Sequence, residues 1–243
     1  MTQQSKRLKI GRLIILGVLV VSVFFVFKYF STLRPSFLFP RWKDYAVHGV
    51  DVSKYQGNVD WYQLKSHEVK FAFIKATEGK ELVDRSFHVN WLGAKEAGIA
   101  RGAYHFYRPS LDWKIQARNF MAQVHLEKGD LPPVLDIELV HHCDQLNLLT
   151  DIRKWLEVIE KHYGIRPIVY TYENYYNRFL LNEFRHYNLW IAKYSYSAPG
   201  LEDNARWEFW QFSESGDLRG IDYKVDLNCF YGTESQFKKI LKK

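Results

Sequence analysis

The sequence predicts an α/β fold: a modified TIM-like barrel of five βα units followed by three strands with little helix. One N-terminal transmembrane helix is expected to precede it. The first observation is that the chain contains eight short apolar segments, each bounded by Gly, Pro, Asp or Asn. This pattern is typical of β-strands. Strands that alternate with helices indicate a parallel sheet, and eight of them indicate closure into a barrel. The candidates are Val47–Val52, Phe71–Thr77, Ala100–Phe106, Val134–Glu138, Ile168–Thr171, Leu189–Tyr194, Glu208–Phe212 and Lys224–Asn228.

The second observation is that helix-like stretches separate the first six strand candidates. In the fourth stretch, apolar residues recur at steps of three and four, which is the period of an α-helix. The segments between the last three strands contain Gly or Pro and are too short for a packed helix. The predicted helices are Trp61–Glu68, Arg85–Ala97, Trp113–Leu126, Leu146–Tyr163 and Asn174–Glu183.

Charge divides the chain into a basic N-terminus and a balanced remainder. The 243 residues have a formal net charge of +7. Residues 1–43 hold eight Lys or Arg and no acid, whereas residues 44–243 hold 26 basic and 27 acidic groups. The main domain therefore lacks the basic surface that nucleic-acid binding requires.

Leu13–Phe27 is an uncharged run of 15 residues behind four basic ones. A spanning helix needs about 20 residues, so we expect residues 10–30 to form a single-pass anchor with the N-terminus in the cytoplasm. A cleaved signal peptide is the alternative, although no A-x-A-like site follows the run. The predicted parts are a basic tip and anchor (1–30), a linker (31–45) and an extracytoplasmic barrel (46–243) in a monomer at the cell membrane.

Acidic residues mark the predicted ends of three strands. Asp136 and Glu138 are two residues apart, so they share one face of a strand. Asp51 lies near the end of the first strand and Asp226 at the end of the eighth. Chemistry in α/β barrels sits at the C-terminal ends of the strands, so the four carboxylates should converge there. A strand end that merely emerges into water is the alternative for Asp136 and Glu138.

A pocket of four carboxylates suits cleavage of a glycosidic bond. One acid must be protonated to donate to the leaving oxygen, and another must be ionised to stabilise positive charge. Crowding of like charges raises one pKa and keeps the donor protonated. Aromatic residues on the predicted strands could stack on pyranose rings, although the position of each one taken singly favours the core over a ligand contact; they are Tyr104, Tyr170, Trp190, Tyr194 and Trp210.

Metal and disulfide chemistry have weaker support. The segment His141–Asp144 (HHCD) fits no zinc-binding spacing and is expected to be a solvated loop. Cys143 and Cys229 could pair outside the cytoplasm, but two cysteines do not make a disulfide framework.

Seven motifs occur in an order that is similar to that of a known family. They are GVDVSKYQG (49–57), FAFIKATEG (71–79), GAYHFYRP (102–109), VLDIE (134–138), LWIAKY (189–194), WQFSESG (210–216) and VDLNCFYG (225–232). Together they resemble the glycoside hydrolase family 25 lysozymes, the Chalaropsis-type muramidases, over about residues 48–232.

The resemblance implies the same modified barrel and hydrolysis of the β-1,4 bond between N-acetylmuramic acid and N-acetylglucosamine in peptidoglycan. It implies that Glu138 is the general acid, Asp136 the second carboxylate, and Asp51 and Asp226 the flanking aspartates. It implies no metal and no cofactor. Because Asp136 and Glu138 are too close for a water between them, substrate-assisted retention through an oxazolinium-like intermediate is favoured over inversion, with a direct aspartyl nucleophile as the alternative.

Three other functions remain open at this level. The domain could bind glycan without turnover, it could recruit a partner to the membrane, or it could hydrolyse chitin-type polymers. Four intact carboxylates favour an enzyme over the first two alternatives. Comparison of chitin with peptidoglycan as substrates distinguishes the third.

Overall fold

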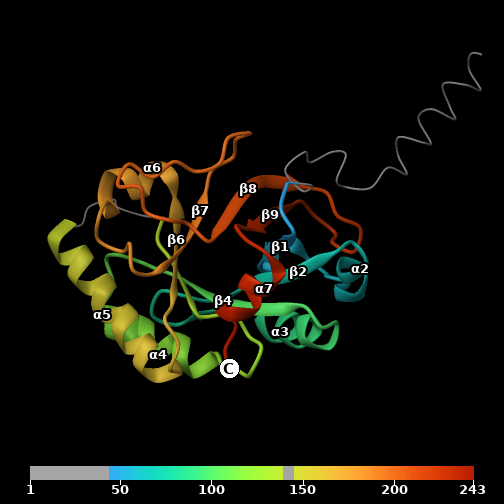
Figure 1. Ribbon diagram of the computed structural model, residues 1–243. Coiled ribbons are helices and arrows are strands. Elements are labelled where there is room, and N and C mark those ends of the chain that lie inside the picture. Colours follow the sequence, from blue (N-terminus) through green and yellow to red (C-terminus); the bar gives the residue numbers. More distant parts are fainter. Residues whose placement is uncertain (1–43, 139–144) are drawn as a thin grey trace, which may run out of the picture. The chain divides into compact units, whose positions relative to one another are not determined.

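The structure is a computed structural model that describes residues 44–138 and 145–243. Residues from Arg41 to Lys243 form one compact unit (Figure 1). The predicted anchor, most of the predicted linker and the HHCD segment with Cys143 lie outside the described residues. Within the described part, no helix is both long and apolar enough to cross a membrane.

One sheet closes into a barrel of eight strands. In spatial order, β1 is followed by β9, β8, β7, β6, β5, β4 and β2, and β1 also pairs with β2. The short β3 extends the sheet from the edge of β2. All eight predicted strands are present, with ends shifted by a few residues. With the unpredicted β3, the described strands are β1 (Val47–Val52), β2 (Val69–Glu78), β3 (Leu82–Val83), β4 (Ala100–Phe106), β5 (Val134–Asp136), β6 (Ile168–Tyr172), β7 (Asn188–Ala192), β8 (Phe209–Gly216) and β9 (Val225–Phe230).

The last strand runs against its neighbours. β9 is antiparallel to both β1 and β8, whereas the other barrel pairs are parallel. The connection of residues 217–224 is too short for a parallel crossover, which takes a dozen or more residues. The prediction that Asp226 ends its strand was therefore wrong: Asp226 is the second residue of β9 and pairs directly with Asp51.

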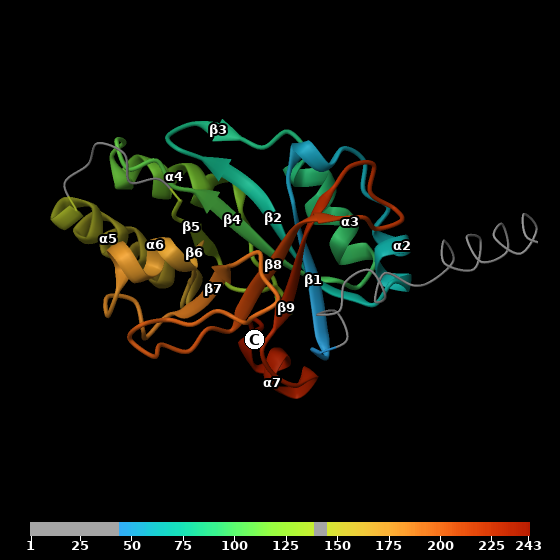
Figure 2. The same cartoon turned by 90° about the horizontal axis from the view of Figure 1, so that it is seen from above.

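Helices cover the outside of the barrel (Figure 2). Four predicted helices are confirmed, and the fifth is mostly a π-helical turn, η4 (Tyr176–Leu180), that follows a short α6. The 3₁₀ turn η3 (Lys54–Gln56) and the C-terminal helix α7 were not predicted. The α-helices are α2 (Trp61–Ser66), α3 (Phe87–Glu96), α4 (Trp113–Gln123), α5 (Gln145–Tyr163), α6 (Glu173–Tyr175) and α7 (Glu234–Ile240).

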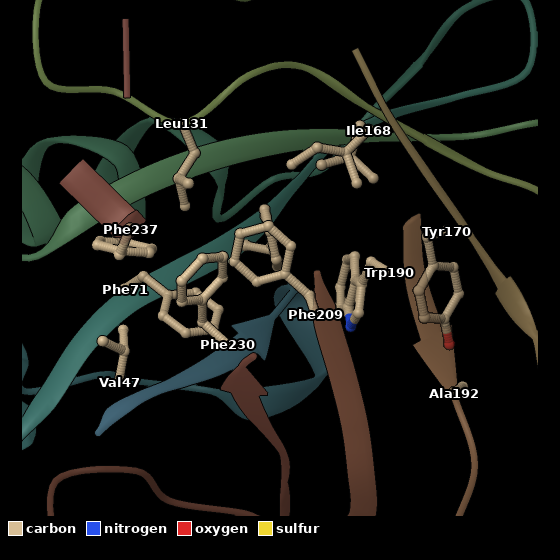
Figure 3. Close-up of a cluster of buried hydrophobic side chains, with 12 residues drawn as sticks. Val47, Phe71, Leu131, Ile168, Tyr170, Trp190, Ala192, Phe209, Phe230 and Phe237 are labelled. Atoms are coloured by element: carbon tan, nitrogen blue, oxygen red, sulfur yellow. The ribbon is translucent and has the colours of Figure 1, made fainter. Parts of the chain in front are cut away.

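Aromatic side chains fill the interior of the barrel (Figure 3). Phe73 stacks on Trp190 with ring centroids 4.2 Å apart, and Trp190 contacts Tyr170 at 4.3 Å. Phe237 of α7 packs against the rings of Phe71 and Phe230, 5.6 and 5.4 Å away. The end of the barrel next to α7 is thus filled by aromatic rings. The polar functional groups lie at the opposite end, where the parallel strands end.

Candidate active site

A pocket of about 220 Å³ opens at the C-terminal ends of the parallel strands. It brings together all four predicted carboxylates, from β1, from the end of β5 and from the start of β9. Because β9 is reversed, its first residues reach the same end of the barrel as the last residues of the other strands. The four acids are Asp51, Asp136, Glu138 and Asp226.

The backbone holds Asp136 and Glu138 toward the same side. β5 ends at Asp136, and the chain continues extended because the Ile137 N–H donates to the Tyr170 carbonyl at 3.0 Å. The Ile137 carbonyl accepts a hydrogen bond from Thr171 Oγ1 at 2.7 Å. Ile137 is fully buried, while both flanking acids line the pocket, as strand alternation requires.

Two amide side chains hold Asp51. Gln211 Nε2 donates to Asp51 Oδ1 at 2.9 Å, and Asn228 Nδ2 donates to the same oxygen at 2.7 Å. The Trp190 indole N–H donates to Asn228 Oδ1 at 2.8 Å, which fixes the orientation of that amide. The hydroxyl of Tyr170 donates to Gln211 Oε1 at 2.9 Å. The network fixes the position of Asp51 at the pocket wall.

Asp51 and Asp226 form one interacting pair of carboxyls, and the pKa of each is raised. Burial raises the pKa of Asp51 despite the hydrogen bonds from Asn228 and Gln211. Burial, followed by repulsion from Asp51, raises the pKa of Asp226. A hydrogen bond between the two carboxyls favours the ionised form of Asp51 and the protonated form of Asp226, which is the usual outcome for neighbouring acids.

Asp136 and Glu138 form a second interacting pair. Burial, followed by repulsion from Glu138, raises the pKa of Asp136 well above its usual range. Oδ1 of Asp136 is buried and meets no hydrogen-bond donor within residues 44–138 and 145–243. Burial also raises the pKa of Glu138, against the effect of the Tyr170 hydroxyl. A single proton shared by the pair therefore suits this part of the pocket.

Lys75 brings a positive charge to the carboxylates. Its ammonium donates to Glu78 Oε2 at 2.7 Å and lies 4.8 Å from the centre of the Phe106 ring. Arg108 also binds Glu78 and lies over the same ring. The charge of Lys75 lowers the pKa of both Asp136 and Glu138, so it offsets part of their repulsion.

Four of the five predicted aromatic residues line the pocket. Tyr104, Tyr170 and Trp190 come from strands, and Tyr194 follows β7. The structure does not bring Trp210 to the pocket: Trp210 is fully buried, and its indole N–H donates to the Lys193 carbonyl. The two residues that flank it, Phe209 and Gln211, face the barrel interior, so alternation turns Trp210 outward.

Sequence reasoning missed several residues of the site. Gln211 and Asn228 carry the hydrogen bonds to Asp51, and Lys75 and Phe106 line the pocket. Asn228 could have been found, because it lies two residues after Asp226 on the same strand face. Within the described residues, no group of three or more His, Cys, Asp or Glu side chains has the arrangement of a metal site.

Sequence comparisons match the chain to one family and to several individual relatives. Residues 50–221 match the sequence model of the glycosyl hydrolases of family 25. The chain is 39% identical over 199 residues to the uncharacterized protein YegX of Escherichia coli strain K12, covering 80% of this chain and 73% of YegX. It is 34% identical over 208 residues to Lysozyme M1 of Streptomyces globisporus, covering 79% of this chain and 70% of that protein.

A solved structure has the same fold. A family 25 glycosyl hydrolase from Bacillus anthracis superimposes with a TM-score of 0.76 at 35% identity, covering 81% of this chain and 94% of that one. The match of more than half the chain to the family model includes three of the four acids of the pocket. The chain therefore belongs to the glycosyl hydrolases of family 25 and is a glycoside hydrolase.

Proposed function

We propose that the protein is a peptidoglycan hydrolase that cleaves the β-1,4 bond between N-acetylmuramic acid and N-acetylglucosamine. The observation that carries the proposal is the convergence of four carboxylates in one pocket of a family 25 chain. Its similarity to a relative named Lysozyme M1 supports the choice of substrate.

In the proposed mechanism, Glu138 donates a proton to the leaving oxygen and later activates water. The acetamido oxygen of the sugar attacks the anomeric carbon, and the bond to the leaving oxygen breaks. Asp136 orients the acetamido group and stabilises the oxazolinium-like intermediate. Water then opens that ring with retention of configuration. A direct aspartyl nucleophile is the alternative.

In this mechanism, the proton shared by Asp136 and Glu138 is the one that reaches the leaving oxygen. In the free pocket, burial and repulsion favour a proton on Asp136. Positive charge that develops on the acetamido group favours ionised Asp136, so it moves the shared proton toward Glu138. The acid is then protonated when the leaving group needs it, because attraction to opposite charge lowers the pKa of Asp136.

The test is digestion of purified peptidoglycan by the wild type and by Glu138→Gln. New reducing ends are reduced with borohydride and identified by mass spectrometry. We expect reduced muramic acid ends from the wild type and a rate lower by about 10²–10⁴ in the variant, the usual contribution of a general acid. Glu81→Gln, which changes an exposed glutamate outside the pocket, is the matched control.

Each other product pattern has a defined meaning. Reduced glucosamine ends would keep the hydrolase and overturn the bond assignment. Higher activity on chitin than on peptidoglycan would overturn the substrate class. Full activity of Glu138→Gln would overturn the role of Glu138 as general acid.

We also propose that residues 10–30 anchor the enzyme in the cell membrane with the barrel on the extracytoplasmic side. The uncharged run Leu13–Phe27 and the basic residues before it support this. After cell fractionation, the full chain should resist extraction from membranes by alkaline carbonate. A chain that lacks residues 1–30 should be released, and recovery of the full chain in the soluble fraction would contradict the proposal.

A further inference from the structure

Two exposed tyrosines lie close together, one lining the pocket and one just outside it. Tyr55 of η3 lines the pocket and is 69% exposed. Tyr223 belongs to the connection of residues 217–224 between β8 and β9 and is 66% exposed. We call these two residues the tyrosine wall. Large aromatic rings exposed beside a pocket are typical of a binding surface.

The two segments that carry the tyrosine wall are bound to each other. The Asn58 N–H donates to Asp222 Oδ2 at 3.0 Å. The Asp60 N–H donates to the Gly220 carbonyl at 2.7 Å. These two hydrogen bonds from main-chain donors join the segment that follows η3 to the connection of residues 217–224. The tyrosine wall is therefore formed by two connected segments and not by the tip of a single loop.

Each ring also has a close neighbour of its own. Gly57 has a φ of 68°, and a Cβ atom there would lie 3.0 Å from a ring carbon of Tyr223, so the ring packs closely on the glycine. The ammonium of Lys54 lies 5.0 Å from the centre of the Tyr55 ring. A ring held in one orientation loses little conformational entropy when a ligand stacks on it.

The tyrosine wall continues the catalytic pocket. Tyr55 lines the same pocket as Asp51 and Asp226, and the Tyr223 ring packs two residues away from Tyr55, on Gly57. A polymer that leaves the pocket on this side passes Tyr55 before it reaches Tyr223. The ligand of the tyrosine wall is therefore the same polymer molecule that binds in the pocket.

We propose that Tyr55 and Tyr223 form an additional glycan-binding subsite, which stacks on pyranose rings beyond the bond that is cleaved. The inference rests on the proposed function, because it assigns the polymer in the pocket to a glycan. Pyranose rings present C–H groups with partial positive charge, and these pack on the negative face of an aromatic ring. The subsite makes the enzyme prefer long strands to short ones.

The test compares glycan strands freed of peptides and separated by length. For the full-length protein, kcat/KM is measured on the shortest strand that is cleaved and on a strand several disaccharides longer. We expect Tyr223→Ala and Tyr55→Ala each to lower the ratio of long-strand to short-strand kcat/KM about fivefold to tenfold, which corresponds to about 1.0–1.4 kcal/mol. Tyr55→Phe should keep the ratio, because stacking needs the ring and not the hydroxyl.

Tyr62→Ala is the matched control, because Tyr62 is 65% exposed on α2 and belongs neither to the pocket lining nor to the tyrosine wall. As a second test, calorimetry measures the binding of the short and the long glycan strand to Glu138→Gln, so it needs no turnover. An unchanged length ratio in both alanine variants, with normal cleavage, overturns the subsite alone. A wild type that neither binds nor cleaves either strand overturns the proposed function as well.

Discussion

The four acids of the pocket have different neighbours. Asp51 accepts two amide hydrogen bonds, and a carboxyl hydrogen bond joins it to Asp226. Asp136 is buried and has an oxygen with no donor among the described residues. Glu138 lies closer to solvent and next to the Tyr170 hydroxyl. Carboxyl groups in one pocket thus acquire different proton affinities, which is what acid–base chemistry at a single pH requires.

The raised pKa of Asp136 predicts a cost in stability at neutral pH. The folded protein keeps a proton on Asp136 that the unfolded chain releases above about pH 3.9. The stabilisation from this carboxyl is present below that pH and is lost as the pH rises through the folded pKa. Asp136→Asn removes the ionisation, so its free energy of unfolding should exceed that of the wild type by about 1–3 kcal/mol at pH 8.

Urea unfolding at pH 4, 6 and 8 measures this difference. It should shrink toward pH 4, where the unfolded wild-type chain also begins to hold the proton. Activity should fall in the same variant, because the asparagine cannot ionise. A variant that is less stable than the wild type at pH 8, with the gap widening as the pH rises, would contradict the prediction.

At the scale of elements, an irregularity in β2 shapes the pocket. The register between β2 and β4 shifts between Lys75 and Thr77, which inserts one extra residue. A bulge of this kind changes which face later side chains occupy. As a result Lys75 and Glu78, three residues apart, lie on the same side and form an ion pair at 2.7 Å.

Removal of the Lys75 charge should shift the pH dependence of activity. Because the ammonium lowers the pKa of Asp136 and Glu138, Lys75→Met should raise both values. The acidic limb of the kcat/KM profile then moves to higher pH, and Lys75→Arg should restore it. The matched control is Lys70→Met on the same strand, where the lysine forms a surface ion pair with Glu234. Profiles that coincide for Lys75→Met and the wild type would contradict this role.

Helix α7 closes the floor of the barrel through one side chain. Phe237 is 6% exposed and contacts three aromatic rings of the core. Phe237→Ala should lower the free energy of unfolding by about 3–5 kcal/mol, the usual cost of a phenylalanine cavity. Lys238→Ala, at the exposed neighbouring position, should change it by less than about 0.5 kcal/mol. Urea unfolding measures both, and equal values would show that α7 does not close the core.

At the scale of the whole molecule, the site depends on closure of the barrel. Gln211 and Asn228 reach Asp51 across 160 and 177 residues of sequence, and β9 joins β1 to β8. The residues that line the pocket lie between positions 51 and 226. The described residues of the site therefore all belong to the unit that begins at Arg41.

A fragment of residues 41–243 should retain the chemistry. We expect its kcat on soluble glycan strands to lie within about twofold of that of the full chain, because the fragment keeps every described residue that lines the pocket. Steady-state kinetics on the same soluble strands tests this for both proteins. A fragment that is folded by circular dichroism but inactive would show that residues 1–40 take part in the reaction.

Sequence patterns predicted much of the fold because their signals are local. Strand candidates come from short apolar runs between turn residues, and all eight were found. Helix α7 was missed, although Thr233 and Gln236 form a capping box that marks its start. The two-residue β3 was missed because its side chains are exposed, so it has no apolar pattern.

The sequence by itself determined the strands, the ordered family motifs and the four acids, because strand-forming runs and acidic residues within them are visible in a few neighbouring residues. The tertiary structure alone decided the direction of β9 and the amide partners of Asp51, which are contacts across most of the chain. It also decided that Trp190 lines the pocket while Trp210 does not. Alternation along a strand separates two faces, but only closure of the sheet determines which face lies inside the barrel.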